Sequence, residues 1–228
     1  MNLSPVVLVT GTDTGVGKTI TTAALASVLQ GRGRSVAVYK PCQSGAADGD
    51  SDAAEIVRLA GVPAEAGVVL QEPMAPVAAA ALDGTPLPAL ASHAERIREL
   101  ATTHDHVLVE GAGGLLVELD SGGGTLAELG SLLAETLPAV FVLVARPDLG
   151  TLNHTALTLE ALAARGLDVL GTVLGSWPAN PDAVHHSNRR VLGALPVPLV
   201  GALPERASEL PPADFRTGAA AWLNGVPA

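Results

Sequence analysis

The sequence predicts an α/β fold, with a doubly wound, mainly parallel sheet flanked by helices in a single domain over residues 1–228. Short apolar segments alternate with longer segments of helical periodicity, an order typical of right-handed βαβ crossovers. The residues are 48% hydrophobic but only 2% aromatic. Small aliphatic side chains must therefore fill the core, which suits helices packed closely on a parallel sheet.

Six strands are predicted from short apolar segments, at residues 5–10, 35–39, 107–109, 139–144, 168–174 and 198–200. Helices are predicted at residues 18–30, 52–60, 92–101, 151–165 and 214–223. Residues 61–91 are rich in Pro, Ala and Gly and give no clear pattern. Polar, glycine-bearing segments follow four of the strands, at residues 11–19, 40–45, 110–114 and 146–153. Because ligands bind at the carboxyl ends of parallel strands, we expect these segments to meet at one edge of the sheet.

Composition limits the partners and the compartment. The formal net charge of -10 argues against a nucleic-acid-binding surface, which requires clustered Lys and Arg. No apolar segment approaches membrane-spanning length and the N-terminus lacks the order of a signal peptide, so we expect a cytoplasmic protein without a membrane partner. The single cysteine, Cys42, excludes an internal disulfide, and we expect it to be a small buried filler.

Residues 11–19 read GTDTGVGKT between a predicted strand and a predicted helix, which is the context of a P-loop. Glycines let the backbone wrap a phosphate, and the helix N-terminus adds its dipole. Lys18 would reach the β- and γ-phosphates of ATP, and the Thr19 hydroxyl would hold Mg²⁺. The spacing differs by one residue from the usual motif, because Thr12 stands where the first glycine is expected and Gly11 precedes it. The sequence therefore predicts a fold of the P-loop NTPase type.

Three charged residues are candidates for the same site. Glu110 follows the strand at residues 107–109, where a Mg²⁺-binding carboxylate is expected, although a solvated loop acid is the alternative. Asp52 is a second candidate, but Asp at a helix start is also an ordinary cap. Lys40 directly follows the second predicted strand and could point into the same crevice as Lys18, or be a surface lysine.

Taken together, five segments resemble the dethiobiotin synthetase family. They are GTDTGVGKT at 11–19, YKPCQSG at 39–45, DSDAAE at 50–55, VLVEGAGGLLVEL at 107–119 and LGTLNHTALTLEAL at 149–162. In this family one amine of 7,8-diaminononanoate captures CO2 as a carbamate, which ATP phosphorylates to a carbamic–phosphoric anhydride. The second amine then closes the ring, giving dethiobiotin, ADP and phosphate. The resemblance implies a Mg²⁺- and ATP-dependent ligase that aligns its substrates and neutralises charge.

The resemblance also assigns roles to residues. The catalytic cations would be Lys18 and Lys40, and the Mg²⁺ ligands Thr19, Asp52 and Glu110. Nucleotide contacts would be Asp13, Thr14, Gly15, Val16, Gly17, Lys18, Thr19, Glu110, Gly111, Ala112, Gly113, Gly175, Ser176, Pro204, Glu205 and Arg206. Substrate contacts would be Thr12, Lys40, Ser44, Gly150, Thr151, Leu152 and Asn153. The last four would face the partner's site across a homodimer interface, because the family binds its substrate carboxylate there.

One departure from the family pattern concerns the base. The family commonly has an Asn-Asp pair after the fifth strand, where this sequence has Gly175 and Ser176. Without that side-chain amide, we expect other nucleoside triphosphates to be accepted beside ATP. Residues 204–206 match the family's second nucleotide loop only through Pro204.

Two other functions use a similar domain. A regulatory ATPase of the partitioning type would carry a signature lysine where Asp13 stands, and would often need a basic or amphipathic surface. A cobyrinic acid amidotransferase would need a glutaminase domain with a nucleophilic cysteine, for which nothing long enough follows residue 201. The partitioning type remains the main alternative to the synthetase.

Overall fold

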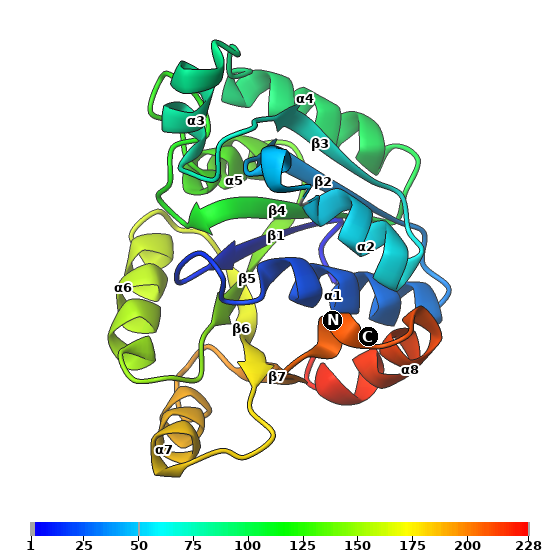
Figure 1. Cartoon of the computed structure of the whole chain (residues 1–228), viewed down its shortest axis with the longest axis vertical. Coiled ribbons are helices and arrows are strands. Elements are labelled where there is room, and N and C mark those ends of the chain that lie inside the picture. Colours follow the sequence, from blue (N-terminus) through cyan, green and yellow to red (C-terminus); the bar gives the residue numbers. More distant parts are fainter. Residues whose placement is uncertain (1–2, 50, 228) are drawn as a thin grey trace.

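The computed structural model describes residues 3–49 and 51–227 (Figure 1). Within these residues seven strands form one sheet in the order β3-β2-β4-β1-β5-β6-β7. All of its strand pairs are parallel. The strands are β1 (Val6–Gly11), β2 (Val36–Gln43), β3 (Ala64–Val69), β4 (His106–Gly114), β5 (Ala139–Ala145), β6 (Val169–Trp177) and β7 (Leu199–Pro204). The predicted fold class is confirmed.

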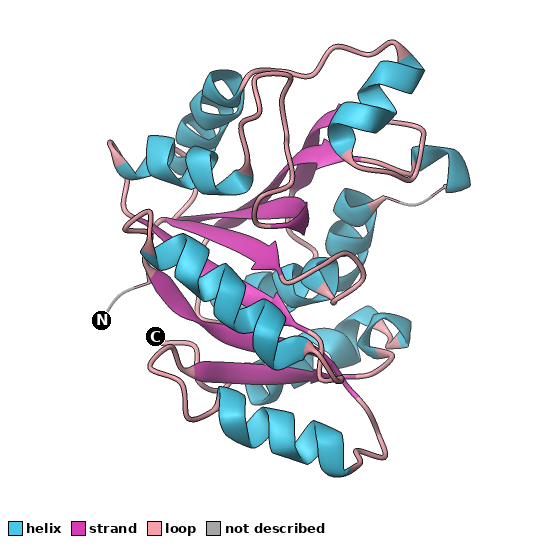
Figure 2. Ribbon diagram, turned by 90° about the vertical axis from the view of Figure 1, so that its left-hand side faces the viewer, coloured by secondary structure: helices cyan, strands magenta, loops and turns pink. Residues whose placement is uncertain are grey.

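The α-helices of the described residues cover both faces of the sheet, and all but the last lie in connections between strands (Figure 2). They are α1 (Lys18–Gly31), α2 (Asp52–Ala60), α3 (Pro76–Asp83), α4 (Leu90–Ala101), α5 (Leu126–Ala134), α6 (Thr151–Ala163), α7 (Ala183–Leu192) and α8 (Pro212–Trp222). Two short 3-10 turns lie at Ala46–Asp48 and Ala207–Glu209. None of these helices has the length and hydropathy needed to cross a membrane.

The core lies on both sides of the central strands because consecutive residues of β1 alternate between the two faces. Val7 and Val9 pack with α1, α2 and α8 on one face, where Phe215 is fully buried. Leu8 packs with α4 and α5 on the other face, where Phe141 is buried. Truncating either phenylalanine to alanine would cost about 3–5 kcal/mol of folding stability.

The strand order reverses next to β1, which pairs with β4 on one side and β5 on the other. The loops that follow these strands therefore leave the sheet at the topological switch point, where open α/β sheets bind ligands. The arrowheads of β1 and β4 mark this edge in Figure 1. The register pairs Val9 with Glu110 and Thr10 with Leu143, so the loop after β1 starts beside the Glu110 backbone.

Several strands extend further at their C-terminal ends than the sequence indicated, and β2 and β4 matter most for the site. β2 continues to Gln43 and β4 to Gly114, so Lys40 and Glu110 lie within strands and not in loops. The prediction of loops at these positions was wrong because pairing with neighbours extends both strands. Lys40 pairs with Ala66 of β3, and Gly114 pairs with Gly11 of β1.

The segment without a clear sequence pattern contains β3 and α3, and α5 was also missed. β3 is a half-exposed edge strand with glycine in its interior, so it lacks the β-branched pattern of a buried strand. Cys42 is buried and free, as expected. Asp50, the first residue of the segment DSDAAE, lies outside the described residues.

Candidate active site

The phosphate loop connects β1 to α1 and leaves the start of α1 open. Gly15 and Gly17 have φ angles of 72° and 95°, in the left-handed region that favours glycine. Gly17 precedes the helix without a side-chain cap, so the first N–H groups of α1 and its positive dipole end stay available to an anion. Lys18 is 7% exposed, and its Nζ donates a hydrogen bond to the Asp13 carbonyl at 3.0 Å.

Four side chains from four elements converge beside this loop. Lys40 of β2 lies with its Nζ 2.6 Å from Asp52 Oδ2 and 2.7 Å from Glu110 Oε1. The Thr19 hydroxyl of α1 lies 2.8 Å from Asp52 Oδ1 and 2.9 Å from the same Glu110 Oε1. Lys40 is 5% exposed and Glu110 is fully buried. The structure therefore excludes both a surface lysine at position 40 and a solvated loop acid at position 110.

Asp52 is not an ordinary helix cap. Ser51 is the N-cap of α2, and its hydroxyl accepts a hydrogen bond from the Ala54 amide at 3.1 Å. Asp52 is the first residue of the helix, and its carboxylate turns toward Lys40 and Thr19. Gln43 supports this arrangement because its side-chain oxygen accepts a hydrogen bond from the Asp52 amide at 3.1 Å. Sequence reasoning gave Gln43 no role, although it lies within YKPCQSG.

The oxygen atoms of Thr19, Asp52 and Glu110 are suitable ligands for a hard divalent cation. The Thr19 hydroxyl has one proton, so it can donate to only one of the two carboxylates that lie within hydrogen-bond distance. Glu110 Oε2 is buried and has no hydrogen-bond partner. Mg²⁺ prefers such oxygen ligands, usually one or two carboxylates together with phosphate oxygens. No cluster of three His, Cys, Asp or Glu that could hold a metal occurs in the described residues, so a metal here would depend on Thr19 and the nucleotide.

The electrostatics of the two lysines differ. Burial lowers the pKa of Lys18 to about 8, and the charge of Glu110 opposes this shift while that of Lys40 adds to it. Burial alone would also lower the pKa of Lys40, but the charges of Glu110 and Asp52 outweigh burial and raise it. The Asp52 pKa is lowered because Lys40 and Thr19 outweigh the effect of burial. Lys40 is therefore positively charged at neutral pH, whereas the pKa of Lys18 lies much closer to neutral pH.

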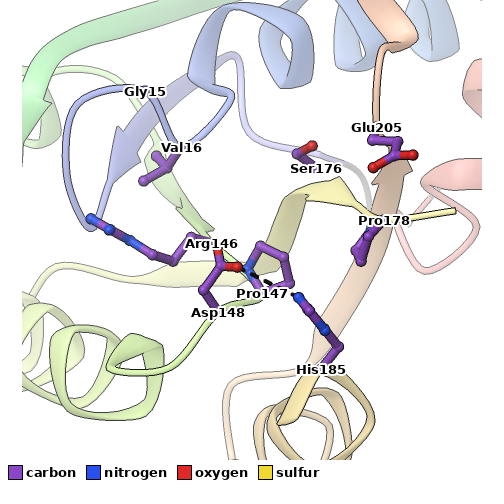
Figure 3. A pocket seen from close by; sticks show the side chains of 9 residues that line it. All are labelled: Gly15, Val16, Arg146, Pro147, Asp148, Ser176, Pro178, His185 and Glu205. Atoms are coloured by element: carbon purple, nitrogen blue, oxygen red, sulfur yellow. Dashed lines mark ion pairs between the residues drawn. The ribbon is translucent and has the colours of Figure 1, made fainter. Parts of the chain in front are cut away.

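Two cavities adjoin the phosphate loop, and Gly15 lines both. The larger, of about 600 Å³, is lined by Lys18, Thr19, Lys40, Asp52 and Glu110, together with Ser44, Ala112 and Gly113. The smaller, of about 300 Å³, is lined by Gly15, Val16, Arg146, Pro147, Asp148, Ser176, Pro178, His185 and Glu205 (Figure 3). Both cavities are therefore in contact with the phosphate loop.

Close packing against the phosphate loop explains why position 175 is a glycine and carries no base-reading side chain. A Cβ atom built there would lie 1.9 Å from the Val16 carbonyl oxygen, because the phosphate loop lies directly on this residue. A Cβ on Gly17 would in turn lie 2.6 Å from the Gly175 oxygen. Ser176 is exposed and lines the smaller cavity, so it is the first residue after Gly175 with a side chain facing that space.

Some predicted site residues lie outside both cavities. Thr12 has a buried hydroxyl without a hydrogen-bond partner, but it lines neither cavity. Arg206 pairs with Glu209 on the surface, and Pro204 ends β7. The substrate segment at the start of α6 also lies outside them, and comprises Gly150, Thr151, Leu152 and Asn153.

The fold and the phosphate loop define a P-loop nucleotide-binding protein, and the family model described as "AAA domain" matches residues 6–212. The chain belongs to the ATP-dependent dethiobiotin synthetase family. It is 52% identical over 211 residues to "ATP-dependent dethiobiotin synthetase BioD" of Mycobacterium avium (strain 104), a match covering 92% of this chain and 91% of that protein. The relative of the same name from Streptomyces coelicolor (strain ATCC BAA-471 / A3(2) / M145) is 47% identical over 225 residues, covering 96% and 92%.

Among solved structures, the septum site-determining protein MinD from Pyrococcus horikoshii OT3, complexed with Mg-ADP, has a TM-score of 0.61. The match covers 98% of this chain and 95% of that one, at 18% sequence identity. The chloroplast FtsY of Physcomitrella patens has a TM-score of 0.55 at 16% identity, covering 96% of this chain and 66% of that one. At these identities the likeness concerns the fold alone, so it gives no support to a partitioning function.

Proposed function

We propose that the protein catalyses the ATP-dependent carboxylation and ring closure of 7,8-diaminononanoate with CO2, giving dethiobiotin, ADP and phosphate. The family membership supports the reaction. The observation that carries the proposal is the buried cluster of Lys40, Asp52, Glu110 and Thr19 beside Lys18. It gathers the cations and oxygen ligands for phosphoryl transfer in a cavity with room for a second substrate.

Lys18 and Lys40 are the two lysines of the sequence, and both are buried at this site. We propose that they stabilise the negative charge on the γ-phosphate and on the carbamate oxygen that attacks it. Lys40 is held at two points by Asp52 and Glu110, so it needs little reorganisation during transfer. The protein moves few protons in this chemistry, and its main contribution is to align carbamate and phosphate.

Thr19, Asp52 and Glu110 are the proposed Mg²⁺ ligands. When bound, Mg²⁺ would neutralise charge on the β- and γ-phosphates. The partnerless Glu110 Oε2 supports this assignment, because a buried carboxylate oxygen otherwise costs free energy. The nucleoside of ATP is assigned to the smaller cavity, where Ser176 and Glu205 line the wall. Other nucleoside triphosphates are proposed to bind there as well.

The larger cavity is the proposed seat of the diamine and its carbamate, with Ser44 on its wall beside Lys40. A homodimer is proposed to complete this site, with Gly150, Thr151, Leu152 and Asn153 of one subunit facing the carboxylate of the substrate bound by the other. Exposed leucines support an interface here, since Leu149 is 84% and Leu157 57% exposed around the start of α6. We propose the cytoplasm as the compartment, in keeping with the single unpaired cysteine.

Subunit mixing tests the shared site. Lys18→Ala and Asn153→Ala proteins should each be inactive, and a mixture that exchanges subunits should regain activity in heterodimers carrying one intact site. Light scattering at the assay concentration provides the control. A fully active monomer would rule out the shared site.

The reaction itself is tested by following ADP release and dethiobiotin formation together. Both should require diaminononanoate and bicarbonate, and both should be lost in Lys18→Ala. ADP release that proceeds at full rate without diaminononanoate, with no dethiobiotin formed, would instead support a regulatory ATPase.

A further inference from the structure

Asp13 carries the one carboxylate within residues 11–19, and two donors bind this carboxylate while a third binds the Asp13 main-chain oxygen. Its Oδ1 accepts a hydrogen bond from the Thr14 amide at 2.8 Å, and its carbonyl oxygen accepts one from Lys18 Nζ at 3.0 Å. Its Oδ2 forms an ion pair with Arg146. The Thr14 amide, with Arg146 and His154, holds the Asp13 pKa below its ordinary value, so the carboxylate is ionised at neutral pH.

Arg146 directly follows β5, the strand that pairs with β1. The backbones already meet here, because the Thr12 amide donates to the Val144 oxygen at 2.9 Å. The side chain of Arg146 extends toward the phosphate loop and away from Asp148 and His185 (Figure 3). It also lines the smaller cavity together with Gly15. Arg146 therefore lies between the phosphate loop and the space assigned to the nucleoside.

A carboxylate in an anion-binding loop repels the triphosphate that the loop must hold. Neutralising it requires a nearby cation that does not itself occupy the phosphate site. We propose that Arg146 is a positioning residue for nucleotide binding, which neutralises Asp13 and fixes the first half of the phosphate loop against β5. The pair contributes little to folding stability, since its side chains are 33% and 54% exposed. The ion pair instead affects the affinity for nucleotides, and this effect increases with the negative charge of the nucleotide.

This inference rests on the proposed binding of Mg-ATP, and calorimetric titration of the full chain with MgATP, ADP and AMP tests it. Arg146→Gln should raise the Kd of MgATP and of ADP by about tenfold and that of AMP by no more than about twofold, because the unpaired Asp13 repels the β- and γ-phosphates most. Asp13→Asn keeps the acceptor for the Thr14 amide and frees Arg146. It should therefore bind MgATP about two- to fivefold more tightly.

The double variant Asp13→Asn, Arg146→Gln should return the Kd of MgATP to within about threefold of the wild-type value. Arg189→Gln is the matched control, because Arg189 lies over the Trp177 ring, whereas the arginine that pairs with the phosphate loop is Arg146. An unchanged Kd in Arg146→Gln, an equal loss for all three nucleotides, or no rescue by Asp13→Asn would overturn the inference. Weaker MgATP binding by Asp13→Asn alone would also overturn it, even if Arg146→Gln fails to fold. Wild-type protein that does not bind MgATP would contradict the proposed function instead.

Discussion

Replacing Lys40 should separate its two effects, on folding and on turnover. At an effective dielectric constant of about 20, a charge contact at 2.7 Å is worth about 6 kcal/mol before desolvation is counted. Lys40 makes two such contacts, but burying the three charges offsets most of this gain. Removing one partner of a buried pair typically costs about 3–5 kcal/mol. We therefore expect Lys40→Met to lower the free energy of unfolding by that amount and kcat/KM by at least about 100-fold.

The stability difference between Lys40→Met and wild type should depend on pH, because the charges of this cluster titrate. In the wild type the folded-state pKa of Asp52 is lowered, so its contribution is present above its unfolded pKa and is lost as the pH falls through the folded value. Without Lys40, the Asp52 carboxylate keeps the burial that raises its pKa but loses the charge that lowers it, so Asp52 gains a proton more readily than in the unfolded chain. The free energy of unfolding of Lys40→Met, relative to wild type, should therefore rise as the pH falls from 7 to 5.

The free energy of unfolding is measured by urea unfolding at several pH values. Turnover is measured by following ADP release at a temperature below the thermal unfolding midpoint of the variant. A second substitution, Asp52→Asn, should recover part of the stability of Lys40→Met but none of its turnover. Near-normal turnover in Lys40→Met would refute the catalytic role. A stability difference that does not change with pH would refute the charge cluster.

Three other results are expected. Because the pKa of Lys18 is lowered to about 8, MgATP binding near pH 8 should be accompanied by uptake of a fraction of a proton. Calorimetry in two buffers of different ionisation enthalpy should detect this uptake. A binding enthalpy that is the same in both buffers would contradict it. GTP, CTP and UTP should support ring closure within about tenfold of ATP in kcat/KM, about 1.4 kcal/mol, whereas a thousandfold preference would mean that backbone groups select adenine. Gly175→Ala should weaken MgATP binding at least about tenfold, because its Cβ would meet the Val16 oxygen at 1.9 Å. Gly31→Ala is its control, since that Cβ would meet no atom within 4 Å outside its chain neighbours and its own helix backbone, and equal affinities would refute the close packing.

The sequence by itself determined the elements whose signals are local. Short β-branched segments gave the central strands, because a strand buried on both faces is apolar at every position. Gly17, Lys18 and Thr19 stand at a strand-to-helix junction, so they predicted the open helix N-terminus that the structure has. Glu110 and Lys40 were predicted to face this loop because all parallel strands end at the same edge, and their side chains do converge there.

Tertiary structure decided what depends on contacts between distant residues. β3 is a strand only because it pairs with β2, and a Cβ on its Gly67 would lie 2.3 Å from Tyr39 Oη. The burial of Lys40 against Glu110 joins positions 70 apart, and the Asp13 pair with Arg146 joins positions 133 apart. No local periodicity encodes such distances, because hydrophobic patterning reports only which face of an element is buried. The charge of each site residue was therefore readable from the sequence, whereas its partner was set by the packing of the sheet.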